Sequence, residues 1–476
     1  MHPDFTLSKP SRRRLLGVAT ALWLSACAPV TPQLQPPVEP PAAFSAAGDQ
    51  ALPERWWLAL DDPGLDGLIE RALAGNLSLQ SAWDRLDQAR ALARRAGADL
   101  YPSLDAEASV SHLRLREGGE TSSSDELGLG LVAGYELDLW GRIRSSREAA
   151  LLDARASADD LQTAALTLSA QVAATWYQLV EQYGQLELLE AQRALNQQVL
   201  ELVTLQFRTG QAGIADVLQQ RQLVESNRGE RAQAEARAGL LEHQLAILLG
   251  SAPGEPVAPR QSGLLELPSL PATGLPAELV QRRPDLRGAW HRVLASDRNL
   301  AAAIAERFPR LSLTAQLSTS GGKASDLFND WLTSLAGNLI GPLVDGGFRR
   351  AEIDRARALA AEDLHTYGQA VLDAFGEVED ALLQERRQRE LIASLDRQLE
   401  LAATVIERVR DRYTKGAVDY QRVLDALLSH QQLQRTRLSA QRELIQNRID
   451  LYRALGGGWE LARGERVTSL TSTGRD

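Results

Sequence analysis

Residues 127–139 read LGLGLVAGYELDL, and this stretch decides how the rest of the chain is interpreted. Leucine occupies most of the odd-numbered positions, and glycine, valine or an acidic residue occupies the positions between them. A period of two predicts a β-strand with one apolar face. A half-buried strand of a soluble protein has the same period, so that alternative stays open. Glycines and small residues on the second face are more typical of a strand in a membrane β-barrel.

Three more segments alternate in the same way. A first hairpin is expected from strands at about 103–115 and 126–140, joined by a polar loop at 117–125. A second hairpin is expected from strands at about 310–319 and 331–343. Each segment is close to the length of a membrane-spanning barrel strand, which is about 9 to 11 residues.

Four such strands cannot form a complete barrel, because about eight are needed to close one. An open sheet in the bilayer would leave backbone N–H and C=O groups unpaired in hydrocarbon, which costs several kcal/mol for each group. We therefore expect several chains to share one barrel. Two chains would supply eight strands and three would supply twelve, and the small residues of an open lumen favour the trimer.

Each expected hairpin is flanked by helices. Residues 62–100 have apolar positions three and four apart and predict one helix, which Pro102 ends. Two proline-free stretches of 66 residues follow the hairpins and would each form about 100 Å of helix. A coiled coil is the alternative, but it leaves the strands unexplained. The long helix, turn glycine and return helix are 142–207, Gly210 and 214–249, and then 348–413, Gly416 and 418–455.

The chain repeats itself once. A shift of 206 residues aligns Gly210 with Gly416, and a shift of 207 aligns Trp83 with Trp290. The period is far longer than that of solenoid repeats, so each copy is a whole module of helix, β-hairpin, long helix and return helix. The expected parts are a first repeat at 61–250, a linker at 251–276, a second repeat at 277–456 and a C-terminal tail at 457–476.

The N-terminus has the features of an export signal. Arginines at 12–14 precede an apolar stretch of about twelve residues, which is shorter than the roughly 20 needed to span a bilayer as a helix. We expect a signal peptide at 1–26. The stretch ends in Leu-Ser-Ala before Cys27, the only cysteine, which resembles the bacterial lipobox; a free thiol is the alternative. The prediction is a covalent lipid on Cys27 and a proline-rich tether at 27–60, exported by the general or the twin-arginine route.

Composition argues against several other classes of protein. A net charge of −10, from 52 basic and 62 acidic residues, argues against a nucleic-acid partner. One cysteine and six scattered histidines give no metal-ligand pattern. Gly128-Leu129-Gly130 lies inside an expected strand, and Gly321-Gly322-Lys323 suits a hairpin tip better than a phosphate loop. We expect no catalytic residue, no metal and no cofactor apart from the lipid.

Four motifs carry a resemblance to a known family: YELDLWGR at 135–142, QRRPDL at 281–286, FPRLSLT at 308–314 and DGG at 345–347. They resemble motifs of the outer-membrane efflux factors, the TolC-like family, in its lipoprotein branch. The resemblance implies a mixed α and β membrane protein, a homotrimer whose twelve-stranded β-barrel continues into a twelve-helix α-barrel. It also implies a passive channel in the cell outer membrane that extends into the periplasm.

The same resemblance implies partners. The channel would be the exit duct of a tripartite efflux pump for drugs or other small toxic molecules. A periplasmic adaptor, also called a membrane fusion protein, would dock at the helix turns of Gly210 and Gly416. An inner-membrane pump, usually of the resistance-nodulation-division type, would supply the energy. The competing hypothesis is a periplasmic coiled-coil scaffold or adaptor lipoprotein that does not span the membrane.

The resemblance also implies a gate at the periplasmic helix turns. Asp425 matches the family's ring aspartate, and three copies facing a narrow pore would favour cations. Asp216 and Tyr413 match positions of the closing network. Arg422 stands where some relatives carry an acidic residue, and Val418 replaces a basic latch residue. The alternative for Asp425 and Arg422 is a solvated side chain on a helix face.

Overall fold

The protein is described here by a computed structural model, which covers residues 36–254 and 258–463. The expected signal peptide at 1–26 and Cys27 lie outside these residues, as does 464–476 of the expected tail. The chain divides into two units, 1–39 and 40–476, and every helix and strand of the described residues belongs to the second.

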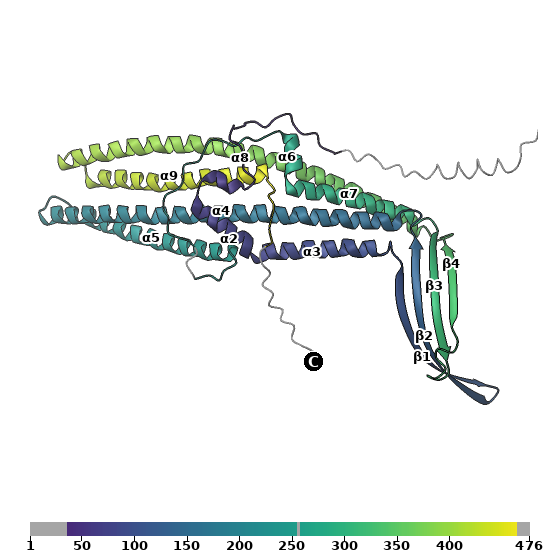
Figure 1. Ribbon diagram of the computed structural model, residues 1–476. Coiled ribbons are helices and arrows are strands. Elements are labelled where there is room, and N and C mark those ends of the chain that lie inside the picture. The colour runs from purple at the N-terminus through teal and green to yellow at the C-terminus, as the bar shows by residue number, and fades with distance from the viewer. Residues whose placement is uncertain (1–35, 255–257, 464–476) are drawn as a thin grey trace, which may run out of the picture. The chain divides into compact units, whose positions relative to one another are not determined.

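The second unit has one helical part and one four-stranded sheet (Figure 1). In the first repeat, helices precede the hairpin, and a long helix and a return helix follow it. The second repeat has the same order. The elements are η1 (Trp56–Leu60), α2 (Pro63–Gly75), α3 (Leu77–Ala98), β1 (Ser103–Glu117), β2 (Glu120–Leu137), α4 (Arg142–Arg208), α5 (Ile214–Leu248), α6 (Pro276–Arg282), α7 (Pro284–Ala305), β3 (Arg310–Gly321), β4 (Leu332–Ile340), α8 (Phe348–Thr414) and α9 (Tyr420–Leu455).

The two hairpins form one antiparallel sheet with the strand order β1-β2-β3-β4. The sequence predicted the hairpins separately, and the β2–β3 pair joins the two repeats. In the register Leu131 lies opposite Ala106 on β1 and opposite Leu317 on β3. Strands β1 and β4 each have one edge with no strand neighbour among the described residues.

The expected polar loop at 117–125 is wrong. Strand β1 continues to Glu117 and β2 begins at Glu120, so that only Gly118 and Gly119 form the turn. Both glycines have positive φ angles, 61° and 93°. A two-residue hairpin turn needs this backbone, which glycine adopts without steric cost.

The helix expected at 62–100 is two helices, α2 and α3, because Asn76 interrupts it. Asn76 has an extended backbone, with φ −67° and ψ 121°. Its side-chain oxygen accepts from the backbone N–H of Leu79 at 3.0 Å, which caps α3, and its amide nitrogen donates to the Leu248 carbonyl at 2.9 Å. An asparagine cap favours a new helix start over continuation of the old helix.

The long helices α4 and α8 have 67 residues each, about 100 Å of helix. Helix α4 contacts α3, α5, α7 and α9, and its middle is therefore buried on most sides. Helix α8 contacts α7 and α9. Among the described residues, no helix combines the length and the apolar character that a bilayer crossing demands.

A cluster of aromatic side chains forms part of the hydrophobic core of the helical part. Trp56 and Trp57 are fully buried, and Trp57 packs against Trp459 with ring centroids 5.0 Å apart. Trp56 packs against Tyr452 at 5.7 Å. The expected tether at 27–60 and the tail at 457–476 must therefore be corrected, because η1 and Trp459 belong to this core. Burying large aromatic rings is strongly favourable, which explains why these segments pack.

A buried ion pair attaches the linker to the second repeat. Arg448 is 0% exposed and binds Glu385 through two nitrogens, at 2.8 and 2.7 Å. It also donates to the carbonyls of Pro268 and Ser269 at 3.1 and 2.9 Å. Burial alone would raise the pKa of Glu385, but Arg448 and Arg389 outweigh burial and lower it. Loss of either partner would leave a buried charge, at a cost of about 3–5 kcal/mol.

Candidate functional site

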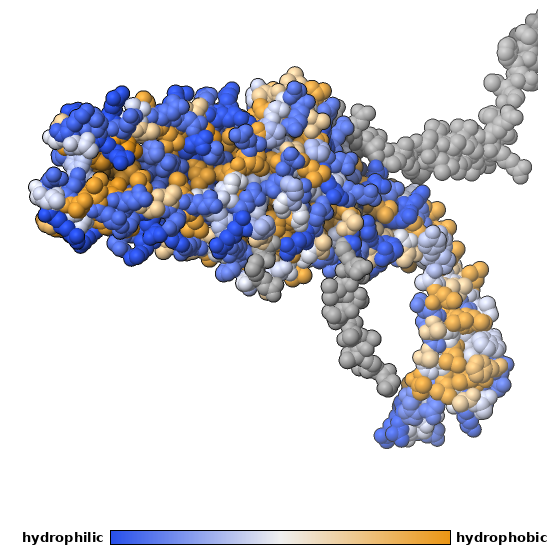
Figure 2. Space-filling view, turned by 60° about the vertical axis from the view of Figure 1, so that its left-hand side comes forward, coloured by the Kyte–Doolittle hydropathy of each residue, from blue (hydrophilic) through white to orange (hydrophobic). Residues whose placement is uncertain are grey.

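The sheet has one apolar face and one face of small and polar residues. Every second residue of each strand carries a side chain on the apolar face, and the continuous register keeps these side chains level across the strands. Figure 2 shows hydrophobic side chains gathered on the strands and hydrophilic ones toward the far end of the sheet. The large exposed members of this face include Leu104, Val110, Leu129, Leu131, Leu313, Leu335 and Leu339.

An exposed apolar face of this size marks a surface that something else covers. The opposite face carries Asp105, Glu107 and Gln316 together mainly with serines and glycines, so it suits contact with water. The sheet thus has the two chemistries of a barrel wall, with lipid on one side and an aqueous lumen on the other.

Aromatic side chains lie at both ends of the apolar face. At the helix end, the Trp140 ring stacks on Phe308 with centroids 4.7 Å apart, and its indole N–H donates to the Pro309 carbonyl at 2.8 Å. At the other end, Phe328 and Trp331 lie 6.0 Å apart beside the β3–β4 turn. Tryptophan and other aromatic residues favour the two water–lipid interfaces, so these pairs indicate where the bilayer begins and ends.

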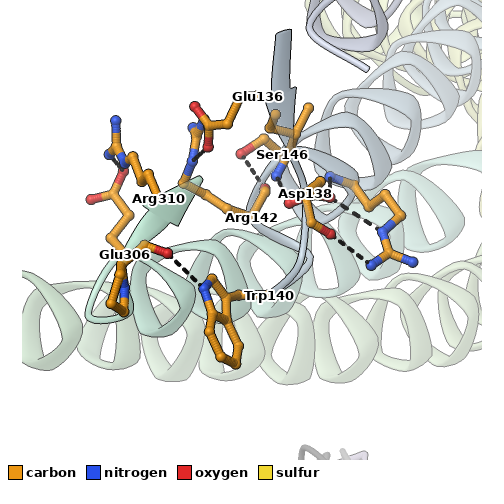
Figure 3. A network of polar contacts seen from close by, with 10 residues as sticks. Glu136, Asp138, Trp140, Arg142, Ser146, Glu306 and Arg310 are labelled. Carbon is orange, nitrogen blue, oxygen red and sulfur yellow. Dashed lines mark hydrogen bonds and ion pairs between the residues drawn. The ribbon is translucent and has the colours of Figure 1, made fainter. Parts of the chain in front are cut away.

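The connection from β2 to α4 is held by Asp138 (Figure 3). Its carboxylate accepts from the backbone N–H groups of Ile143 and Arg144 at 3.0 and 2.9 Å, and from the Arg144 guanidinium at 3.2 Å. Burial opposes ionisation, but these bonds outweigh it, and the pKa of Asp138 is lowered. Next to it, Arg142 binds Glu136 of β2 at 3.0 Å. The helix start and the strand end are therefore fixed to each other.

The second repeat uses the same device. Asp345 accepts from the backbone N–H groups of Gly347 and Arg349 at 3.0 and 3.3 Å, and from the Arg349 guanidinium at 3.2 Å. The backbone amide of Arg349, then that of Gly347, and then the guanidinium lower the pKa of Asp345. Gly141 and Gly347, which precede the two long helices, have φ angles of 77° and 89°. The motifs YELDLWGR and DGG thus specify a turn from sheet to helix.

The far ends of the long helices form two turns at Gly210 and Gly416, with φ angles of 75° and 68°. The Tyr413 hydroxyl donates to the side-chain oxygen of Gln206 at 3.0 Å and so connects the end of α8 with the end of α4. The Tyr413 ring lies 5.8 Å from that of Tyr420, whose hydroxyl donates to Gln220 at 2.6 Å.

The structure brings two of the four predicted gate residues near each other. The pKa of Tyr413 is raised first by burial and then by the charge of Asp216. Asp216 itself accepts from the backbone N–H of Gly213 at 2.9 Å at the start of α5. Asp425 lies on α9 and accepts from Gln421 at 2.7 Å, and the Arg422 backbone N–H donates to Asp419 at 3.3 Å.

Asp216, Arg422 and Asp425 form no ion pair within residues 36–254 and 258–463. Sequence reasoning missed a buried amide cluster behind the tip. The side chain of Gln431 donates to that of Asn196 at 3.0 Å, and Gln220 donates to the Asn196 carbonyl at 2.7 Å. The only sequence signal was amide residues at helix positions that otherwise resemble a solvated face.

Comparison with known proteins agrees with this geometry. Residues 68–251 and 275–457 match the family model described as outer membrane efflux protein, once for each repeat. The chain belongs to this family.

Two relatives and one solved structure show how far the similarity extends. The pyoverdine export outer membrane protein OpmQ of Pseudomonas aeruginosa is 34% identical over 477 residues, covering 95% of this chain and 98% of OpmQ. The cation efflux system protein CusC of Escherichia coli K12 is 31% identical, with 94% and 99% covered. The structure of the outer-membrane channel OprN has a TM-score of 0.84 at 30% identity, with 90% and 99% covered.

These findings confirm the predicted fold class, family and localisation. The protein is an outer-membrane channel that extends into the periplasm, and it is the outer-membrane component of a tripartite efflux system. Like its structural neighbours it is a trimer, in which three copies of the four-stranded sheet supply twelve strands. The alternative of a scaffold that never enters the membrane is wrong.

We expect Asp138→Asn to destabilise the junction by about 1–2 kcal/mol per chain, because the amide cannot replace a charged helix cap. The pKa of Asp138 is lower in the folded chain than in the unfolded chain. Its carboxylate therefore stabilises the fold at pH values above the unfolded pKa, and this stabilisation is lost as the pH falls through the folded pKa. Thermal unfolding of the detergent-purified trimer at pH 7 and pH 3 should show a lower midpoint at pH 7 and a smaller acid-induced loss. The control is Asp354→Asn, an exposed pair with Arg357; an equal acid-induced loss in both variants would contradict the assignment.

Proposed function

We propose that the trimer is a passive exit duct for small toxic molecules, with drugs among them, and that an inner-membrane pump supplies the energy. The observation that supports this most is the four-stranded sheet with one apolar face, one small and polar face and two open edges. Similar chains are named for pyoverdine export and for cation efflux, which are chemically unlike cargoes. Such different cargoes are explained if the outer-membrane duct is common to these systems and the inner-membrane pump selects the substrate.

We propose that the duct is gated at its periplasmic tip, with Asp425 as the carboxylate of the constriction. Asp425 is exposed on α9, about one and a half turns from the start of the helix at Tyr420. Its charge is not neutralised by an ion pair among the described residues. Three symmetry-related copies around a narrow pore would concentrate negative potential there. Tyr413, Asp216 and Arg422 lie at the neighbouring turns and would hold the closed state.

The channel and its gate are tested together in a planar lipid bilayer. Purified trimer should conduct, and Asp425→Ala should raise single-channel conductance or weaken block by hexaamminecobalt(III) by about tenfold, since three carboxylates leave the constriction. Asp425→Asn should act like the alanine variant, and Gln421→Ala, which removes only the hydrogen-bond partner of Asp425, should not. Absence of conductance under every gate-opening condition would contradict the duct, whereas unchanged block would remove only Asp425 from the gate.

We propose that a periplasmic adaptor docks on the turns at Gly210 and Gly416. Large apolar side chains are exposed beside the first turn, where the surface of a long polar helix would otherwise be charged. A groove of about 360 Å³ between α4, α8 and α9 adds apolar surface near the second turn. The exposed residues beside the first turn are Leu202, Leu205, Phe207, Ile214 and Leu218.

If the adaptor docks on the turn at Gly416, two substitutions of this residue should differ in their effect on adaptor binding. The φ angle of Gly416 is 68°. Asparagine tolerates this left-handed backbone, whereas a β-branched residue is strained there by about 1–2 kcal/mol and reshapes the turn. We expect Gly416→Val to reduce co-purification of adaptor and pump with tagged trimer from cross-linked host membranes, and Gly416→Asn to retain it. Both variants should give the same yield of purified trimer, which separates docking from folding and assembly. Equal recovery of partners with both would contradict docking at this turn.

We propose that Cys27 carries a covalent lipid that anchors the chain. One relative is named a probable outer membrane lipoprotein, SilC of Salmonella typhimurium, at 28% identity. Mass spectrometry of the N-terminal fragment from membranes should find Cys27 as the first residue with an added acyl mass. Cys27→Ser should abolish that mass, and a free Cys27 thiol in the wild-type chain would contradict the lipid.

A further inference from the structure

The β1–β2 hairpin extends farther from the helices than the rest of the sheet. Strand β2 pairs with β3 only from Leu127 to Leu137, so residues 111–126 form a two-stranded ribbon beyond the four-stranded part (Figure 1). The helices extend into the periplasm, and the opposite end of the sheet therefore lies on the outer side of the membrane. This ribbon is the part of the chain that meets the outer leaflet and what lies above it.

The lipid-facing side of the sheet continues along the ribbon with a change of chemistry. The β1–β2 register is unbroken from Ser103 to Glu117, so the face that carries Val110 also carries His112, Arg114 and Arg116. Cross-strand partners on this face are Asp125, Ser123 and Thr121. A band of aliphatic residues thus passes directly into a band that contains two arginines and a histidine.

Acidic residues of the ribbon lie mainly on the other face. Glu117, Glu120 and Glu126 alternate with the outward-facing positions, and Glu117 lies opposite Glu120. The single outward acid, Asp125, is already bound by His112 at 2.6 Å. Arg114 and Arg116 are exposed and have no ion pair with the described residues. The outward face therefore has two positive charges that are available to a partner.

The position of these arginines relative to the bilayer follows from the aromatic residues. Phe328 and Trp331 lie beside the β3–β4 turn, near the level at which Leu127 pairs with Gly321, and mark the outer interface. Arg114 is four residues beyond Val110, which for a tilted strand is about 10 Å above the apolar band. Arg116 is about 15 Å above it by the same geometry. From these heights the long arginine side chains can reach down to the head-group layer, which is roughly 5–8 Å thick on each side of the bilayer.

We propose that the outward face of this ribbon binds the phosphate groups of the phosphorylated glycolipid in the outer leaflet, the lipid A and inner-core region of lipopolysaccharide. Arginine binds phosphate with two parallel hydrogen bonds, and a basic cluster next to an apolar band attracts anionic head groups. The acyl chains cover the band that ends at Val110 while the phosphates reach Arg114 and Arg116. In the trimer, three such sites surround the channel mouth.

The test measures binding of fluorescent lipid A to purified full-length trimer in a neutral detergent. We expect Arg114→Gln combined with Arg116→Gln to weaken binding by about tenfold or more, because each basic group near an anionic surface contributes about 1 kcal/mol. Dephosphorylated lipid A should bind the wild-type trimer as weakly as lipid A binds this variant. Trimer content and bilayer conductance should not change, which separates this proposal from the channel function.

Two matched variants complete the experiment. Arg114→Lys combined with Arg116→Lys retains the charges and should recover most of the binding. Glu117→Gln combined with Glu120→Gln changes the opposite face of the same ribbon and should leave it unchanged. The proposal is overturned if the glutamine variant binds lipid A like wild type, or if lipid A with and without phosphates binds wild type equally.

Discussion

Strand pairing in hydrocarbon is the constraint on which the rest of the molecule depends. Inside one chain, β1 and β4 end the sheet with open edges. Each unpaired backbone group in lipid costs several kcal/mol, which is more than contacts between surface side chains can offset. The open edges must therefore pair with β4 and β1 of neighbouring copies. Association of several copies therefore follows from the pairing needs of the backbone. The apolar outer face follows from the position of that backbone in the bilayer.

The junctions between the strands and the long helices set the direction of the helices relative to the barrel. Asp138 and Asp345 each cap a helix of 67 residues within a few residues of the strand before it. Because a rigid helix extends any angular error at its start over about 100 Å, the direction of the helix must be fixed at this point. The Trp140 ring adds a link across repeats, since it bonds the carbonyl of Pro309 just before β3.

Patterns that repeat over many residues were predictable from the sequence. Alternation located the strands, and proline-free stretches located the long helices, because both signals are averaged over ten or more positions. The strand residues at 117–125 were missed because serine, threonine and glutamate in a ribbon outside the membrane have no apolar face to reveal the period. The break at Asn76 and the burial of Trp57 and Trp459 depend on contacts with distant segments, which a local pattern does not contain.

The residues proposed for the gate were harder still to predict, because the role proposed for them depends on neighbours across the threefold axis. Within one chain, contacts become weaker from the aromatic core toward the tip. Near the core, α2, α4 and α9 bury tryptophan and tyrosine rings, whereas the tip has a small apolar cluster and single neutral hydrogen bonds such as Tyr413 to Gln206. Local opening costs least where few apolar contacts are lost. A channel built this way can move at its periplasmic end while the barrel and the core stay in place, and this is the end at which we propose that the adaptor docks.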